Sequence, residues 1–371
     1  MEIKVSQNQL ARALNVVSRV AAGSRTTLPI LNNVLIRADD GKISLSTTNL
    51  DIAVVSYTPG TVVKNGVITV PVRILGEFVT NLPKGEDIVI KLDGMKVVVS
   101  AGKYKSVING VAADDFPEIP VIDESTAVTF RVGVDEFKET VSDVAIASSN
   151  DMTRPVLTGV YWYTVDKNLY LVTTDGYRLA EKKFIGDVES EVKVVIPASS
   201  LQEVVRSLAP EDDELEILID ESQVKFRFKD TEITSKLIDG SFPDYRQLIP
   251  KKTDINVVVK RDELVRVAKL AALFAKEVGG SITCETKEDG NNKGVFIVSS
   301  VANEYGENNS EIVVTDVKDG KVTLNSKFLI DAINVISADE VSFGFSGKLS
   351  PVLLRGTKDK DYLHIIMPLK S

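Results

Sequence analysis

The sequence predicts an α+β fold, and three observations lead to that prediction. The first is an internal repeat: six times, an apolar position in an extended stretch is followed five residues later by the first apolar position of a helical pattern. The second is the helical periodicity after each of these points, and the third is the strand-like alternation between them. The six pairs are Val5/Leu10, Val70/Leu75, Val132/Phe137, Ile196/Leu201, Val259/Leu264 and Leu324/Leu329.

The spacing of the repeat predicts the domain organisation. Successive pairs start 65, 62, 64, 63 and 65 residues apart, so each copy is expected to be a similar supersecondary unit. Two strand–helix–strands units per domain divide the 371 residues into three tandem domains, each long enough for its own core. Polar or proline-containing joints predict domains at residues 1–122, 127–250 and 253–371.

Each predicted helix is short and amphipathic. Apolar residues recur at spacings of three and four, which gives every helix one apolar stripe that is expected to pack on one side of a sheet. Ser6 is a predicted N-cap, and Pro71 and Pro197 suit a first helical turn. The stripes are Leu10, Leu14 and Val17; Leu75, Phe78, Val79 and Leu82; Phe137, Val141 and Val144; Leu201, Val204, Val205 and Leu208; Leu264, Val267, Ala268 and Ala271; and Leu329, Ile330, Ile333 and Ile336.

Between the helices the chain alternates as strands do. Residues 43–47 and 224–228 carry apolar or β-branched side chains at every second position. Turns are expected at Asp40–Gly41, Asn65–Gly66, Asp93–Gly94, Asp239–Gly240 and Asp319–Gly320, and a polar loop at Lys287–Lys293.

A polar landmark repeats in step with the helices. Thr47-Thr48-Asn49 recurs as Thr173-Thr174-Asp175 at an offset of 126, and Ser299-Ser300 follows at another 126. The same local structure is therefore expected in all three domains.

Composition narrows the class of protein. No window approaches 18 uncharged apolar residues, so no membrane span is predicted, and the N-terminal residues do not resemble a signal peptide. A single cysteine, Cys284, excludes an intramolecular disulfide and fits a reducing cytoplasm. The net charge of −9 argues against simple groove binding to nucleic acid, but it does not exclude DNA, because one face can be basic on an acidic protein.

The sequence gives little support to an enzyme. With one histidine, His364, and one cysteine, it lacks a His/Cys cluster for zinc and any phosphate-binding glycine loop. The acidic groups Asp114–Asp115 and Glu211–Glu214 are interpreted as solvated loop charges rather than metal ligands. No cofactor and no metal are predicted. A carboxylate-dependent enzyme stays an alternative without specific support.

Four segments carry a resemblance to a known family: TLPILNNVLI (Thr27–Ile36), TRPVLTGV with TTDGYRLA (Thr153–Val160 and Thr173–Ala180), DGSFPDYRQLIP (Asp239–Pro250) and the terminal HIIMPLKS. The whole chain resembles the beta subunit of bacterial DNA polymerase III, the replicative sliding clamp. The resemblance implies three tandem DNA-clamp domains that form half of a six-domain ring, closed by a head-to-tail homodimer. It also implies that the ring encircles duplex DNA and tethers the polymerase without catalysis of its own.

A sliding lining needs weak, sequence-independent attraction to phosphates. Basic residues on the helix faces away from the apolar stripes are candidates for it: Arg12, Arg19, Arg73, Arg206, Arg266, Lys269 and Lys327. Arg25 matches a DNA-contact position of the family. Residues 148–151 match another, but Asp151 puts a phosphate contact there in doubt.

The resemblance also implies a groove for short peptides of polymerases and loader subunits. Its apolar residues suit varied ligands, and Arg178 and Lys370 are expected at its rim, where they can bond a peptide. The matching residues are Leu157, Thr174, Gly176, Tyr177, Arg178, Leu179, Pro243, Gln247, Leu248, Ile365, Met367, Pro368, Leu369 and Lys370. Leu179, Leu248 and Ile365 have the alternative interpretation of core residues.

The implied dimer joins the end of the first domain to the third domain of a second copy, edge strand to edge strand. By position, Lys103, Lys105 and Ile108 would face Leu273, Phe274, Glu304 and Glu307. The expected partners are duplex DNA, the polymerase III catalytic subunit, the clamp loader complex and other proteins with clamp-binding motifs. A monomeric repeat scaffold for other proteins is the alternative.

Overall fold

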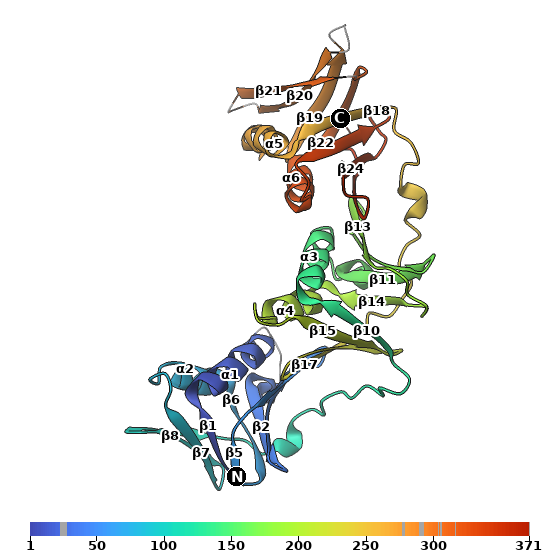
Figure 1. Ribbon diagram of the computed structural model, residues 1–371. Coiled ribbons are helices and arrows are strands. Elements are labelled where there is room, and N and C mark those ends of the chain that lie inside the picture. The colour runs from blue at the N-terminus through green and yellow to red at the C-terminus, as the bar shows by residue number, and fades with distance from the viewer. Residues whose placement is uncertain are drawn as a thin grey trace. The chain divides into compact units, whose positions relative to one another are not determined.

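The computed structural model describes residues 1–22, 28–276, 279–288, 293–302, 304, 306–315 and 317–370. They form two compact units. Figure 1 labels the helices and strands of both. Unit 1 comprises Met1–Asp135 and Ser199–Leu237, and unit 2 comprises Glu136–Ala198 and Ile238–Ser371. The second predicted domain, residues 127–250, therefore contributes to both units, and the boundaries of the three domains stay a prediction.

The six predicted strand–helix pairs are confirmed, because in each of them a helix begins directly after a strand. The pairs are β1 (Glu2–Ser6) with α1 (Gln7–Ala22), β6 (Gly66–Pro71) with α2 (Val72–Thr80), β10 (Val128–Gly133) with α3 (Val134–Ala145), β14 (Lys193–Pro197) with α4 (Ala198–Ser207), β18 (Ile255–Lys260) with α5 (Arg261–Ala275), and β22 (Gly320–Asn325) with α6 (Ser326–Val335). The fold is the predicted α+β class.

Local chemistry explains where these helices begin. The Ser6 hydroxyl accepts the Gln9 amide at 3.4 Å and donates to the Gln9 side chain at 3.0 Å, so the predicted N-cap is confirmed. Asn325 caps α6 in the same way, accepting the Lys327 amide at 2.9 Å. The placement of Pro71 and Pro197 inside a first helical turn was wrong: each is the last residue of its strand. Pro71 is the N-cap of α2, where the missing N–H costs the helix no hydrogen bond.

Unit 1 contains two antiparallel sheets. The five-stranded sheet has the order β5-β1-β7-β8-β9 and the eight-stranded sheet the order β10-β15-β16-β17-β4-β3-β2-β6. The remaining strands are β2 (Asn33–Asp39), β3 (Lys42–Thr48), β4 (Ile52–Thr58), β5 (Thr61–Lys64), β7 (Asp87–Asp93), β8 (Lys96–Ala101), β9 (Tyr104–Asn109), β15 (Glu214–Ile219), β16 (Gln223–Phe228) and β17 (Thr231–Lys236).

Helices α1 and α2 lie side by side (Figure 1), with α1 on β1, β2, β3 and β4 and α2 on β2 and β6. Leu10, Leu14 and Val17 of the predicted stripe are buried. The Thr47 hydroxyl donates to the Val17 carbonyl at 2.7 Å, which ties β3 to the helix. The hydrophobic periodicity therefore selected the correct faces of helix and strand.

Unit 2 contains sheets of eight and four strands, in the orders β14-β11-β12-β13-β25-β24-β23-β18 and β21-β20-β19-β22. Helix α5 packs on β19, β20 and β21, and α6 lies beside it (Figure 1). The remaining strands are β11 (Gly159–Val165), β12 (Asn168–Thr174), β13 (Arg178–Ile185), β19 (Ser281–Glu288), β20 (Lys293–Ala302), β21 (Gly306–Thr315), β23 (Glu340–Phe345), β24 (Val352–Gly356) and β25 (Tyr362–Ile366).

The polar landmark of the repeat is conserved in structure, with one correction. Thr47 pairs with Val54 and Thr173 with Ala180, and both threonines donate to a helix carbonyl. In the third copy the inward, buried residue is Ser300, which pairs with Asn308. The equivalent of Thr173 is therefore Ser300, at an offset of 127, and not Ser299, because a shift of one residue reverses the face of a strand.

Two turn predictions are resolved by backbone geometry. Asp40 and Gly41 have φ values of 45° and 76°, the left-handed pair that a two-residue hairpin between β2 and β3 requires. The loop predicted at Lys287–Lys293 was partly wrong, because Lys287 and Glu288 end β19 and Lys293 begins β20. Residues 289–292 lie outside the described residues.

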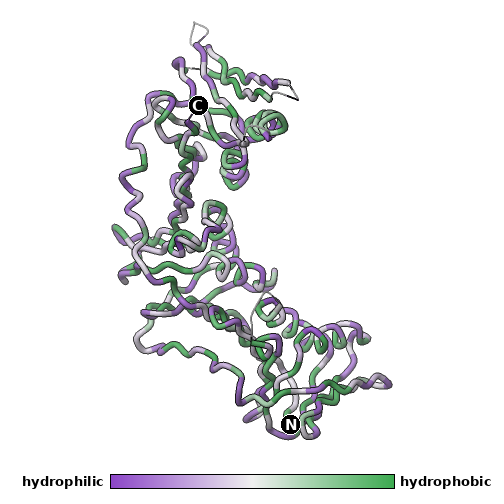
Figure 2. Tube along the Cα trace, turned by 180° about the vertical axis from the view of Figure 1, so that it is seen from behind, coloured by the Kyte–Doolittle hydropathy of each residue, from purple (hydrophilic) through white to green (hydrophobic). Residues whose placement is uncertain are grey.

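Hydrophobic and hydrophilic residues alternate along the tube in both units (Figure 2). Among the described helices, none has the length and apolar character needed to cross a membrane.

Candidate functional site

The structure brings the C-terminal segment next to the loop that precedes β13. Leu179 of β13 lies opposite Ile365 of β25, and the Met367 amide donates to the Tyr177 carbonyl at 2.8 Å. The Leu369 amide donates to the Thr323 carbonyl, also at 2.8 Å. Two regions of the predicted peptide groove, about 190 residues apart in the sequence, are therefore neighbours in the fold.

The loop Thr174–Arg178 is fixed by its own side chains. The Thr174 hydroxyl accepts the Gly176 amide at 3.1 Å and donates to the Arg178 carbonyl at 2.7 Å. One Asp175 oxygen accepts the amides of Tyr177 and Arg178 at 2.9 and 3.0 Å. Gly176 has a φ of 90°, which a side chain at this position would strain. The loop is thus preorganised, with Tyr177 63% exposed at its tip.

Arg178 does not occupy the open rim position that the sequence predicted. It is buried, and its guanidinium donates to Asp175 at 3.1 Å and to Asp331 at 2.8 Å. It also lies 4.4 Å from the centroid of the Phe328 ring. Its Nε and Nη1 groups donate within the protein, so Arg178 joins β13 to α6.

This arrangement sets the charge of Asp331. Burial alone would raise the pKa of this carboxyl group. The hydrogen bonds from Lys327 and Arg178 outweigh burial and lower the pKa below its ordinary value. The carboxylate is therefore kept ionised at neutral pH.

The other predicted groove residues divide into an exposed and a buried group. Leu248 is 49% exposed, so it is not a core residue, whereas Leu179 and Ile365 belong to a buried cluster with Tyr163 and Tyr245. The remaining buried residue is Leu157, the remaining exposed ones are Gly176, Pro243, Gln247 and Lys370, and the partly buried ones are Thr174, Met367, Pro368 and Leu369.

Residues 239–250, here called the second strap, pack against Tyr161 and Tyr163 of β11. The side of the eight-stranded sheet of unit 2 on which these two side chains lie is here called its outer face. Phe242 of this strap stacks on Tyr161, with ring centroids 4.8 Å apart and an interplanar angle of 9°. The Tyr245 hydroxyl donates to the buried Glu181 carboxylate, and the Tyr163 hydroxyl donates to the same oxygen at 3.0 Å. The sequence analysis found the strap as a motif but missed these anchors.

Burial decides the ionisation of the two tyrosines. Loss of hydration raises the pKa of Tyr163 to about 12, and burial together with the nearby Glu181 charge raises the pKa of Tyr245 well above its ordinary value. Both hydroxyls therefore stay protonated and act as donors to Glu181. Arg246 completes the cluster by donating to the Tyr163 oxygen at 2.7 Å.

Most of the basic residues predicted to contact DNA are paired with carboxylates. Surface pairs of this kind contribute about 0–1 kcal/mol, so phosphates can replace the carboxylates at little cost. Arg266 and Lys269 are exposed on α5, and no carboxylate of the described residues lies within ion-pair distance of either. The pairs are Arg12–Glu211 at 2.9 Å, Arg19–Glu203 at 3.8 Å, Arg73–Glu77 at 2.9 Å, Arg206–Glu203 at 3.5 Å and Lys327–Asp331 at 2.8 Å.

Two further DNA predictions have different outcomes. Arg25 lies outside the described residues. Asp151 accepts the Thr153 amide at 3.0 Å and the Thr153 hydroxyl at 2.8 Å, and these bonds lower the pKa of its carboxyl group. A stabilised negative charge at this position supports the doubt about a phosphate contact.

The residues predicted for the dimer contact lie on or near two edge strands, β9 and β21, and on helix α5. Within the described residues, β9 ends the five-stranded sheet and β21 ends the four-stranded sheet. Lys103 and Lys105 are exposed at β9, while Glu304 and Glu307 are exposed at β21. On α5, Leu273 is 59% exposed and Phe274 is half-buried. Ile108 is buried in its own domain, so Val107, 53% exposed on the opposite face, was missed.

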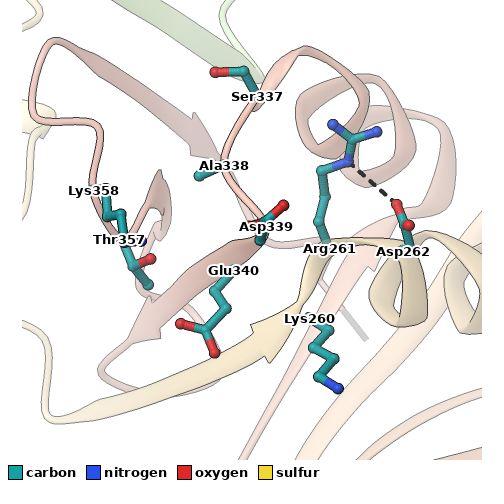
Figure 3. Close-up of a pocket in the computed structure, with 9 residues that line it drawn as sticks. All are labelled: Lys260, Arg261, Asp262, Ser337, Ala338, Asp339, Glu340, Thr357 and Lys358. Carbon is teal, nitrogen blue, oxygen red and sulfur yellow. Dashed lines mark ion pairs between the residues drawn. The ribbon is translucent and has the colours of Figure 1, made fainter.

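A polar depression in unit 2 holds none of the predicted site residues (Figure 3). Its volume is about 670 Å³, and Arg261 within it pairs with Asp262 at 3.6 Å. Three basic and three acidic side chains line it. The lining residues are Lys260, Arg261, Asp262, Ser337, Ala338, Asp339, Glu340, Thr357 and Lys358.

The acidic groups considered as metal ligands have other roles. Asp212 is buried, accepts the Ala209 amide and pairs with Lys229 at 2.9 Å, so its interpretation as a solvated charge was wrong. Across the described part of the chain, no group of three or more His, Cys, Asp or Glu side chains is placed to hold a metal ion.

Comparisons with known proteins identify this architecture. Family models of the DNA polymerase III beta subunit match residues 1–120 (N-terminal domain), 131–244 (central domain) and 246–370 (C-terminal domain). The curated beta sliding clamp of Bacillus subtilis is 28% identical over the full length of both chains. Since the models span most of the sequence, the chain belongs to the DNA polymerase III beta subunit family, the sliding clamps of DNA replication.

Solved structures agree with this assignment. The sliding clamp of Bacillus subtilis superposes with a TM-score of 0.94 at 28% identity, covering 100% of this chain and 99% of that one. The DNA polymerase III beta subunit of Pseudomonas aeruginosa gives 0.93 at 26% identity, with full coverage of both chains. That of Thermotoga maritima gives 0.90 at 27% identity, covering 100% and 99%.

Proposed function

We propose that two copies of this chain close head to tail into a ring that encircles duplex DNA and tethers the replicative polymerase. The observation that carries this proposal is a strand joint that the chain makes twice. β4 pairs with β17 in unit 1, and β13 pairs with β25 in unit 2. Each joint links one predicted domain to the next through an antiparallel ladder.

Two further strands are equivalent to the strands of these joints, and within the described residues both lie at a sheet edge. β21 is the third equivalent of β4 and β13, because Asn308 pairs with Ser300 as Ala180 pairs with Thr173. β9 is the equivalent of β17, because each is the second strand of a hairpin of the same kind. Ala101 pairs with Tyr104 in the β8–β9 hairpin, and Phe228 pairs with Thr231 in the β16–β17 hairpin. A second copy can therefore supply the missing partner at both edges, which closes the assembly and covers both edges.

We propose the third joint in the register of the two existing ones. Thr234 lies opposite Ala53, and Ile365 lies opposite Leu179. The same register places Val107 of β9 opposite Glu307 of the second copy. Lys105 then lies diagonally between Glu307 and Glu311 on one face, so the charges are complementary.

The other parts of the proposal follow from the family. The helix cations, of which all but the partly buried Arg19 are exposed, are proposed to face the DNA as a weakly attracting lining together with Arg25. They are Arg12, Arg19, Arg73, Arg206, Arg266, Lys269 and Lys327. Weak contacts suit sliding, and the ring keeps the polymerase at a high effective concentration near the primer end.

The exposed groove residues Tyr177, Pro243, Gln247 and Leu248, with the segment Met367–Lys370, are proposed to dock peptides of the polymerase, the clamp loader and other proteins with clamp-binding motifs. We further propose that the protein is non-catalytic, needs no cofactor and works in the cytoplasm as three domains at 1–122, 127–250 and 253–371.

Sedimentation equilibrium tests the ring. The wild-type chain is expected at twice its chain mass, and the double variant Leu273→Asp/Phe274→Asp at the mass of one chain, because charge at the proposed interface core opposes burial. Leu349→Asp, which charges another exposed apolar residue, is the matched control and is expected to stay dimeric. An unchanged dimer mass in the double variant would contradict the proposed contact.

A further inference from the structure

The second strap carries three of the exposed residues of the proposed peptide groove, namely Pro243, Gln247 and Leu248. An exposed segment without regular strand pairing needs anchors to hold its side chains in one place, because each free residue costs conformational entropy on binding. The position of the strap's anchors therefore matters for binding.

The strongest anchor lies directly beside the groove residues. Tyr245 is 3% exposed, and its hydroxyl donates to the buried Glu181 carboxylate. The Tyr245 carbonyl in turn accepts the Leu248 amide at 2.8 Å, which forms the short turn Arg246–Leu248. The side chain of Tyr245 is thus bonded to Glu181, and its backbone carbonyl is bonded to the Leu248 amide.

The same anchor contacts the floor of the groove. Tyr245 belongs to one buried cluster with Leu179 and Ile365, the two groove residues that are core. Glu181 lies two residues after Leu179 on β13. The strap and the strand beneath it are therefore held in register by one charge-assisted hydrogen bond within an apolar surrounding, where such a bond is strong.

We propose that Tyr245 and Glu181 are positioning residues for peptide binding, acting through the turn that presents Gln247 and Leu248. The inference rests on the proposed peptide groove. Within the DYRQL part of the motif, Tyr245 and Arg246 hold the strap in place, whereas Gln247 and Leu248 contact the peptide.

Fluorescence anisotropy tests the assignment with a labelled peptide that contains glutamine followed by leucine and phenylalanine. Tyr245→Phe keeps the ring and removes the hydroxyl, so the dissociation constant is expected to rise about three- to tenfold, the effect of one hydrogen bond. Tyr170→Phe, which removes another hydroxyl from the same sheet face, is the matched control and is expected to bind within about twofold of wild type.

Two further readouts separate positioning from a loss of folding. Hydrogen exchange of the Leu248 amide is expected to accelerate in Tyr245→Phe while the dimer mass stays unchanged. Glu181→Gln, which keeps an acceptor, is expected to bind more tightly than Glu181→Ala. Wild-type affinity in Tyr245→Phe, or an equal loss in Tyr170→Phe, would overturn the inference alone. No saturable binding by wild type would instead overturn the proposed groove, and the inference with it.

Discussion

The first and the third copy of the repeat, here called the first and the second repeat because they begin the first two predicted domains, have the same backbone pairing and different side chains on the sheet faces that carry the straps. Register equates Leu35, Arg37, Ser44, Ser46 and Val55 with Tyr161, Tyr163, Tyr170, Val172 and Glu181. In the first repeat these residues line a cavity of about 770 Å³ beneath residues 113–121, here called the first strap. In the second repeat, stacked aromatic rings and the Tyr245–Glu181 bond occupy the equivalent surface.

The difference indicates how one fold can offer a surface for the proposed peptide groove in only one of these repeats. The sheet and its helices repeat because they supply the core, and the strap is free to differ because it crosses a solvent-facing surface. The first strap covers a cavity, whereas the second strap is anchored beside the proposed peptide groove.

Removing the main ring of each strap is expected to have unequal effects. Tyr245→Ala deletes a buried aromatic side chain and its bond to Glu181, and about 3–5 kcal/mol of local stability should be lost. Phe116→Ala in the first strap should cost about 1–2 kcal/mol, because that ring lines a cavity that is already open. Native-state hydrogen exchange of the two straps measures both losses, and equal losses would contradict the comparison.

The loops before β4 and β13 offer a second exchange between repeats. Both use the same threonine and Asn/Asp hydrogen bonds, but Ile52 of the first stands where Arg178 stands in the second. Arg178→Ile is expected to cost about 2–3 kcal/mol, because Asp331 loses a charge-assisted partner. Chemical denaturation compares it with Ile52→Val, for which about 1 kcal/mol is expected.

The same pair has a definite pH dependence. The folded-state pKa of Asp331 is lowered, so its contribution to stability is present above the ordinary carboxyl pKa and is lost as the pH falls through the lowered value. Wild type and Arg178→Ile should therefore converge in acid. A constant difference down to low pH would contradict this origin of the stability.

Alkaline titration distinguishes the two outer faces. The pKa of Tyr163 is raised from 10.0 to about 12, so the stability it contributes is present below pH 10 and is lost as the pH approaches 12. The second strap is expected to loosen in this range, seen as faster proteolysis at Lys251 and Lys252, while the first strap is unchanged. Tyr163→Phe should remove the difference.

The smallest effect is expected from filling the first cavity. Ser46→Val copies Val172 of the second repeat onto a buried strand position, and the free energy of unfolding of unit 1 should rise by about 0.5–1 kcal/mol. Denaturant titration measures the change. A loss of stability would mean that the first cavity cannot accept the packing of the second repeat.

The repeat and the hydrophobic periodicity predicted the fold well, because burial of one face per element is a local property of the sequence. Every predicted helix stripe followed a strand as expected. The errors arose at positions whose place in the fold depends on strand pairing that the sequence pattern does not show. The repeat offset of 126 predicts Ser299. The pairing of Ser300 with Asn308 puts the equivalent position one residue later, and the sequence alone does not reveal this pairing.

The candidate site was predictable only in part, for a similar reason. Resemblance named the groove residues, but it did not reveal that Arg178 is engaged by Asp331, 153 residues away, or that Glu181 lies under Tyr245. Ile108 was assigned to a surface although it faces the core, since neither its alternation nor its neighbours distinguish the two faces of an edge strand.

The central claim is that a second copy completes the strand joint in the register of the two existing joints, and paired cysteines test it directly. Val107→Cys/Glu307→Cys places two thiols opposite each other in that register, within reach of a disulfide. Val107→Cys/Glu311→Cys moves one thiol about 13 Å along the strand and serves as the control. The native Cys284 is fully buried and burial raises the pKa of its thiol to about 12, so it should not react. The account predicts that oxidation converts the first variant to a covalent dimer, reversed by reductant, and leaves the control as single chains. Failure of the first variant to cross-link, or equal cross-linking of both, would contradict the proposed ring.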